Sequence, residues 1–284
     1  MFADYILVVT ATILFSLEFL FVRKIEEENG TNLKTTLSCS FYKSFSVAII
    51  MLVISGFKIQ ITLISVLLAA LFACVELTMA YFGLKAMSVT NLSVYSVFMM
   101  LGGMLLPFLL GVVVYNEELT VGKIICCVLI FISLILNCKK TGGNKKAIIY
   151  YVAIFILNGL LGVISTVHQS LNIPHASSEC FMLLSALILP ILSGALLLII
   201  YRRIPLAGPK SLFYYSGYGS VNGIGNLFLL IALINLPASV QYPLVTGGVM
   251  LFTTLIGAIR REKITVFEYI AAAIALAASI IICF

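Results

Sequence analysis

The sequence predicts an all-α integral membrane protein with ten transmembrane helices, arranged as two inverted five-helix repeats. Of the 284 residues, 62% are hydrophobic and only 10% are charged, whereas a soluble domain is about 45–50% apolar and about 25% charged. A chain this apolar cannot supply the polar surface that a soluble protein exposes to water. The composition therefore excludes a soluble enzyme, a nucleic-acid-binding module and a disordered chain.

Ten apolar runs divide the chain, and most are close to the roughly 20 residues that a helix needs to cross the hydrocarbon core of a bilayer. The runs are continuously apolar, which favours helices over membrane-spanning strands, because such strands alternate polar and apolar residues. The gaps between the runs are too short for an extramembrane domain. The runs are 4–22, 36–55, 61–86, 91–115, 121–137, 147–168, 178–201, 211–233, 238–259 and 264–284.

Lysine and arginine are divided unequally between the two sides of the predicted bundle. Of the 17 basic residues, all but Lys43, Lys58 and Lys123 lie in or beside the loops that follow the odd-numbered spans. Cytoplasmic loops carry an excess of Lys and Arg. The count therefore places these loops inside the cell and both chain termini outside. We expect a multi-pass protein of the cell membrane of a prokaryote.

The second half of the chain repeats motifs of the first half. Leu101–Met104 is echoed by Thr246–Val249, and Glu117–Thr120 by Glu262–Thr265, both 145 residues later. Five spans per half is an odd number, so the halves must cross the membrane in opposite directions. Inverted repeats are typical of secondary transporters that bind substrate near the bilayer midplane. The predicted units are repeat 1–140, basic linker 141–146 and repeat 147–284.

Two further stretches carry a family resemblance. Leu84–Ser93, followed by Asn116–Thr120, is similar to the fourth-helix signature of the drug/metabolite transporter superfamily, and Leu236–Pro243 with Arg260–Thr265 is its second-half partner. The chain resembles the EamA-like ten-helix branch over nearly its whole length. The resemblance implies alternating-access transport of a small metabolite or drug. It also implies cytoplasmic termini, and a cavity lined by the first, third, fourth, sixth, eighth and ninth helices.

Three ionisable side chains lie deep within predicted spans, where each costs several kcal/mol and needs a reason. Lys43 and Glu76 lie near the middles of neighbouring antiparallel spans, so we expect them at similar depth. They are either an ion pair that fixes helix packing or a site at which Glu76 couples transport to a proton or substrate. Glu18 either pairs with a loop base or faces the cavity. An acidic first span resembles the small multidrug branch, which implies a role for Glu18 in binding cations and protons.

Several uncharged polar side chains are further candidates for a substrate site. Tyr218, Asn222 and Asn226 recur every four residues and share one face of the eighth span, where they either line a cavity or join helices by hydrogen bonds. Pro243 permits bending of the ninth span, which suits a gate as well as a harmless kink. The remaining candidates are Tyr95, Asn158, Gln241 and Tyr242.

These features favour a secondary transporter for a small organic metabolite or drug, such as an amino-acid-like compound or an amine, with proton coupling left open. A passive channel and a membrane-embedded enzyme are the alternatives. The sequence holds no HExxH, GxSxG or Walker motif, so we expect no catalytic residues, no cofactor and no bound metal. The expected partners are a small-molecule substrate, protons and the lipid bilayer, without nucleic acid. The oligomeric state stays open.

Overall fold

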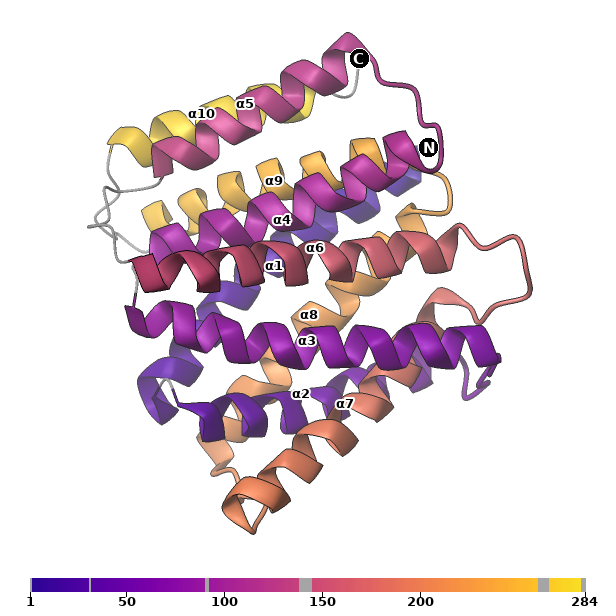
Figure 1. Ribbon diagram of the computed structural model, residues 1–284, viewed down its shortest axis with the longest axis vertical. Helices are drawn as coiled ribbons and strands as arrows, with labels where there is room; N and C mark the ends of the chain where they lie inside the picture. Colours follow the sequence, from indigo (N-terminus) through magenta and orange to yellow (C-terminus); the bar gives the residue numbers. More distant parts are fainter. Residues whose placement is uncertain (1, 31, 90–91, 138–144, 260–265, 282–284) are drawn as a thin grey trace.

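The chain folds into helices joined by short connections (Figure 1). A computed structural model describes residues 2–30, 32–89, 92–137, 145–259 and 266–281, and no strand occurs within these ranges. Ten helices lie in the described residues. They are α1 (Phe2–Asn29), α2 (Leu33–Ile54), α3 (Leu63–Val89), α4 (Leu92–Val113), α5 (Val121–Asn137), α6 (Lys145–Gln169), α7 (Ser178–Tyr201), α8 (Pro209–Ala232), α9 (Ala238–Ile259) and α10 (Val266–Ile281).

Six of these helices are long and apolar enough to cross a membrane, namely α1, α2, α3, α6, α7 and α9. Shorter apolar segments lie in α4, α5 and α10. The outer faces also carry large exposed apolar side chains, among them Phe131, Ile191 and Ile199. A soluble monomer rarely exposes apolar surface on this scale. The protein is a multi-pass membrane protein, with these side chains turned toward lipid.

Each predicted apolar run coincides with a helix, but some of the helices are longer than the runs. Helix α1 continues past the predicted end at residue 22 and reaches Asn29, so its last two turns carry Glu26, Glu27 and Glu28. Residues 138–144 and 260–265, which hold much of the basic linker and the last of the repeated motifs, lie outside the described residues. The same is true of Thr90 and Asn91 in the fourth-helix signature.

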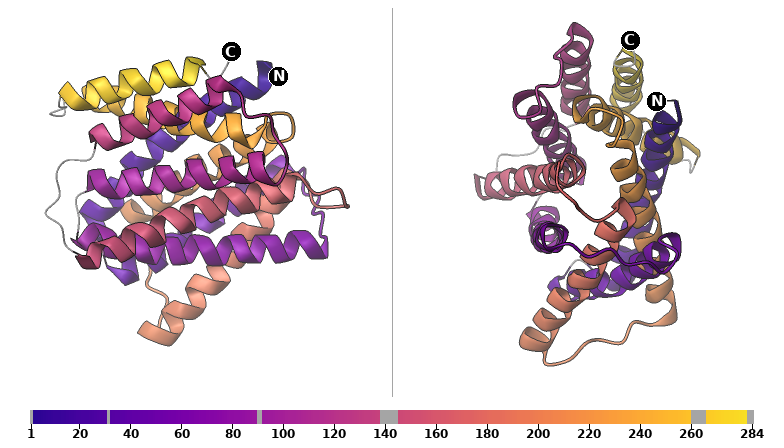
Figure 2. Two further views of the ribbon diagram at one scale, coloured as in Figure 1. Left: turned by 45° about the horizontal axis from the view of Figure 1, so that its top comes forward. Right: turned by 90° about the vertical axis from the view of Figure 1, so that its right-hand side faces the viewer.

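The helices run side by side as one bundle, which the right-hand view of Figure 2 looks along. Helix α1 packs on α8 and α9, α2 packs on α7 and α8, and α6 packs on α3 and α4. Helices α5 and α10 pack on each other at one edge of the bundle (Figure 1). Although α2 and α3 follow each other in the chain, they contact each other only sparsely.

The two ends of the bundle differ in charge. We call one the basic end, where the α1–α2 and α7–α8 connections lie with Arg23, Lys24, Arg202, Arg203 and Lys210. We call the other the terminal end, where α1 begins and where the α2–α3, α4–α5, α6–α7 and α8–α9 connections lie (Figure 1).

Glycine lets helix backbones approach closely at two interfaces. A Cβ atom on Gly219 of α8 would overlap the backbone carbonyl of Lys43 in α2, and one on Gly102 of α4 would overlap the carbonyl of Phe155 in α6. Small residues at such crossings are the usual means of tight packing between membrane helices. The backbone of Lys43 is thereby held against α8.

Replacing Gly219 with Ala is expected to force α8 away from α2 and to lower the free energy of unfolding by about 1–3 kcal/mol, the usual cost of overpacking. Gly122→Ala, which also lies within a helix, is the matched control, since no atom lies closer than 3.4 Å to the added Cβ. The thermal midpoint of the detergent-purified protein measures both. A Gly219→Ala midpoint equal to that of the wild type would show that the two helices are not in this close contact.

Candidate functional site

A cavity of about 350 Å³ occupies the middle of the bundle. Its inner end is lined by Gly162 of α6 and Tyr242 of α9, and its lining extends to Gly30 and Thr36 at the basic end. Ligand-binding pockets commonly have volumes of about 300–1,000 Å³. The space therefore suits a small organic molecule at membrane depth.

Eight helices contribute side chains to this cavity, and within the described chain neither α5 nor α10 does. The resemblance implied helices 1, 3, 4, 6, 8 and 9. The structure adds α2, through Cys39, Ser40 and Lys43, and α7, through Met182 and Ser185. These two helices take part because α2 packs on α7 and α8 and lies only loosely against α3, which leaves room between α2 and α3.

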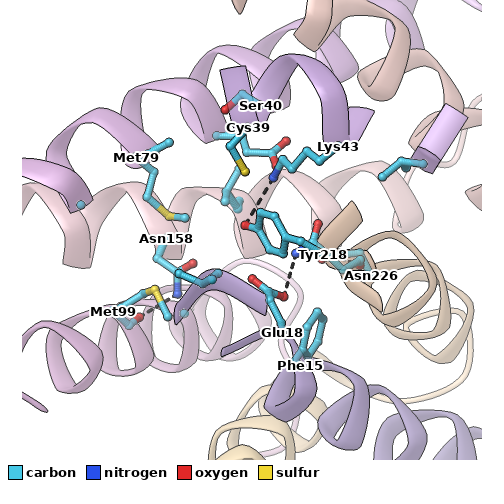
Figure 3. A pocket seen from close by; sticks show the side chains of 18 of the residues that line it. Phe15, Glu18, Cys39, Ser40, Lys43, Met79, Met99, Asn158, Tyr218 and Asn226 are labelled. Carbon is cyan, nitrogen blue, oxygen red and sulfur yellow. Dashed lines mark hydrogen bonds and ion pairs between the residues drawn. The ribbon is translucent and has the colours of Figure 1, made fainter. Parts of the chain in front are cut away.

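Lys43 and Glu76 form an ion pair across this space. The Lys43 Nζ lies 2.5 Å from Glu76 Oε1, and the two side chains are 7% and 18% exposed. The same ammonium lies 4.6 Å from the centroid of the Tyr218 ring and 3.4 Å from its hydroxyl (Figure 3). The depth expected from the sequence is thus confirmed, and the pair is part of the cavity wall.

Glu18 also faces the cavity, and its partner is an amide. Asn222 donates a hydrogen bond of 2.9 Å from Nδ2 to Glu18 Oε2 (Figure 3). One turn further along α8, Asn226 donates to the backbone oxygen of Asn222. In the described part of the chain the Glu18 carboxylate forms no ion pair, so of the two alternatives for Glu18 the structure places it in the cavity.

Part of the cavity lining is apolar and flexible. Met79 of α3, Met99 and Met100 of α4 and Met182 of α7 form this part. Asn158 lies between them and donates a hydrogen bond of 2.7 Å to the backbone oxygen of Met99 (Figure 3). Flexible, polarizable methionine side chains adapt to ligands of different shape. The cavity therefore combines charged groups with an adaptable apolar surface.

The remaining sequence candidates fall in different places. Tyr242 lines the inner end of the cavity. Its neighbour Gln241 is fully buried outside the lining, and its amide nitrogen donates to the backbone oxygen of Leu229 in α8. The structure therefore places Gln241 in helix packing and not in the cavity. Tyr95 belongs to α4, but its side chain lies outside the described part of the structure.

Glu26 is a charged lining residue that the sequence reasoning missed. It lies two turns beyond Glu18 on the same face of α1, near the mouth of the cavity. One of its carboxylate oxygens is buried and has no hydrogen-bond partner among the described residues. The position of Glu26 could have been predicted, because Glu18, Val22 and Glu26 are spaced by four and share one helix face. The predicted span, however, ended at residue 22.

The charged groups of the described lining are three carboxylates and one ammonium. Glu76 is balanced by Lys43, whereas neither Glu18 nor Glu26 forms an ion pair within the described residues. Ionised groups at membrane depth are stabilised by opposite charge or by water. The cavity is therefore suited to a ligand that carries a positive charge, or to protons.

No protein-family model matches the chain, and no curated protein matches it. A solved structure named only "Crystal structure of protein" is similar over 99% of this chain and 98% of that chain, with a TM-score of 0.78 and 15% sequence identity. At this identity the likeness concerns the fold alone. The whole ten-helix arrangement therefore occurs in another protein.

If the cavity carries a substrate across the membrane, Asn222→Ala is expected to raise the apparent Michaelis constant of uptake by roughly tenfold, because it removes the hydrogen bond that orients the Glu18 carboxylate. Gln241→Ala is the matched control. Its amide lies outside the cavity, so we expect a lower thermal midpoint with an unchanged Michaelis constant. Uptake measured against substrate concentration separates the two, and equal Michaelis constants for Asn222→Ala and wild type would place the substrate elsewhere.

Proposed function

We propose that the protein is a secondary transporter that moves a small organic molecule across the membrane by alternating access. The observation that carries the proposal is the cavity at membrane depth, where three carboxylates and one ammonium share the lining with apolar methionine side chains. Its lining reaches the basic end, while the terminal end is occupied by side-chain and backbone contacts between α6, α9 and the α4–α5 connection. A cavity open to one side at a time is what a carrier requires.

Two inverted repeats, 1–140 and 147–284, are part of this proposal, and helix packing supports them. If α1–α5 correspond to α6–α10, the packing of α1 on α8 matches that of α6 on α3. The packing of α2 on α8 likewise matches α7 on α3, and that of α1 on α9 matches α6 on α4. The pairs α2–α7, α4–α9 and α5–α10 map onto themselves. A two-fold relation between the halves would produce this set of partners, together with the repeated sequence motifs.

The unbalanced carboxylates favour a substrate with a positive charge, such as an amine or an amino-acid-like zwitterion, with protons competing for the same groups. The positive charge of the basic end supports a cytoplasmic location for that end in the cell membrane. On this orientation the cavity faces the cytoplasm. Membership of the drug/metabolite transporter superfamily rests on the motif resemblance and remains part of the proposal.

A thermal-shift screen of the detergent-purified protein tests the proposal. The panel contains amino acids, polyamines, nucleotide sugars and cationic drugs, each at two pH values. A compound that binds only the folded protein raises its thermal midpoint by mass action. We expect hits among amines or zwitterions that weaken at lower pH and in Glu18→Gln. Hits confined to anionic compounds, unaffected by Glu18→Gln, would contradict the proposed site.

A further inference from the structure

A second cavity lies at the terminal end, beyond the inner end of the first. It measures about 210 Å³ and is lined by Glu117 of the α4–α5 connection, by Thr166 and Ser170 of α6, and by residues 233–238 between α8 and α9. These elements all belong to the end opposite the mouth of the central cavity. The two cavities therefore approach each other from opposite sides of the bundle.

Hydrogen bonds join the linings of the two cavities. The Tyr242 hydroxyl donates a hydrogen bond of 2.9 Å to the backbone oxygen of Gly162, and the Thr166 Oγ1 lies 3.4 Å from the same hydroxyl. Gly162 and Tyr242 line the central cavity, whereas Thr166 lines the terminal one. Gly162, Thr166 and Tyr242 are all buried. We call these three residues the Tyr242 barrier.

The first turn of α9 holds Tyr242 in this position. Glu117 accepts hydrogen bonds of 2.9 Å from the backbone N–H groups of Ala238 and Ser239, one on each carboxylate oxygen. Both residues lie within one turn of Tyr242. Pro243 follows directly, and because proline has no N–H, the turn that precedes it is attached to the rest of α9 by one hydrogen bond fewer. The first turn of α9 is thus fixed by Glu117 at one end and weakened by Pro243 at the other.

We propose that the Tyr242 barrier closes the substrate path at the terminal end, and that the terminal cavity is the vestibule through which substrate leaves or enters once the barrier opens. This inference rests on the proposed function. Opening breaks the bond from the Tyr242 hydroxyl to Gly162 as the first turn of α9 moves about Pro243. Glu117 acts as a positioning residue, since it sets where that turn lies and does not face the central cavity.

Access to Cys39, a native thiol in the central cavity, tests this barrier without knowledge of the substrate. A membrane-impermeant maleimide is added to one side of the membrane, and mass spectrometry of the Cys39 peptide measures the labelling rate. Exposed reference positions first establish which side is which. Asn172→Cys marks the terminal end and Gly208→Cys the basic end.

In wild-type protein we expect Cys39 to be labelled faster from the basic end than from the terminal end. Tyr242→Phe keeps the ring but removes the hydroxyl, so we expect labelling from the terminal end to rise roughly two- to tenfold, which corresponds to the loss of one hydrogen bond. Glu117→Ala should act in the same direction. Tyr215→Phe is the control, because Tyr215 is a buried tyrosine that stacks on Tyr42, away from α9.

Labelling from the basic end shows that the cavity is still formed, and alternating access predicts that it stays equal or falls when the terminal end opens. If Tyr242→Phe is labelled from the terminal end at the wild-type rate while its labelling from the basic end is normal, the barrier lies elsewhere and the inference is overturned. If Cys39 is labelled equally fast from both ends in the wild type, the cavity is open to both sides at once, and this result would overturn the proposed function as well. Failure of the barrier alone leaves the transporter proposal standing.

Discussion

Lys43→Met is expected to destabilise the protein by about 3–5 kcal/mol, because it leaves the largely buried Glu76 carboxylate without its cation. Met has about the length of Lys and keeps an apolar chain. The loss of stability therefore comes from removing the charge and not from creating a cavity. The thermal midpoint of the purified protein measures the effect. An unchanged midpoint would show that the ion pair contributes nothing to the fold.

The double variant Lys43→Met/Glu76→Met separates a structural role of this pair from a functional one. Replacing both members of a buried ion pair by apolar residues of similar volume is often neutral for stability. We therefore expect the double variant to recover most of the lost stability but to remain inactive in transport. Normal transport by a stable double variant would reduce the pair to a packing element and remove Glu76 from the coupling site.

Glu18→Gln is expected to lower transport about tenfold or more while the protein still folds. The amide has the shape of the carboxylate, and its oxygen can still accept the hydrogen bond from Asn222. What is lost is the negative charge in the cavity, and hydrogen bonds to charged groups contribute about 1.5–3 kcal/mol. Initial rates of uptake into proteoliposomes, at equal protein content, measure the effect.

Glu28→Gln serves as the matched control for Glu18→Gln. Glu28 is on the same helix, but it lies at the basic end and pairs with Lys210 at 2.7 Å, away from the cavity lining. We expect wild-type transport from this variant. If the Glu18 and Glu28 variants transport equally well, the deep carboxylate has no part in substrate or proton binding.

Much of the charged site could be predicted from the sequence, because an ionisable residue inside an apolar run stands out. Lys43 and Glu76 were expected at one depth and do pair, and the spacing of Tyr218, Asn222 and Asn226 correctly placed them on one face of α8. A charged side chain inside a span needs water or a partner of opposite charge. It is therefore expected to face the interior of the bundle and not the lipid.

The rotation of the apolar helices could not be predicted in this way. Lipid tails are as apolar as a protein interior, so the face of a membrane helix that packs inward leaves little hydrophobic signal. Gln241 and Tyr242 are adjacent and were equally good candidates, yet one packs against α8 and the other faces the cavity. The choice depends on how α9 contacts α8 and α6, which no local pattern records.

The contribution of α2 to the cavity could also have been predicted from the sequence. Ser40, Lys43, Ser44 and Val47 are spaced by three and four, which places them on one face of the helix, and all four line the cavity. Polar residues that share a face with a buried charge indicate a hydrated or ligand-bearing surface. Glu26 could have been predicted to line the cavity in the same way, if α1 had been expected to extend beyond its apolar run.

Solute counterflow tests the central claim, that this protein is a carrier with alternating access, most directly. Proteoliposomes are preloaded with an unlabelled compound found in the thermal-shift screen and diluted into a trace of the labelled compound. Alternating access predicts that label accumulates transiently above its equilibrium level, and that Glu18→Gln abolishes this overshoot. Label that rises to equilibrium without an overshoot, at a rate that does not saturate with concentration, would indicate a channel and contradict the account.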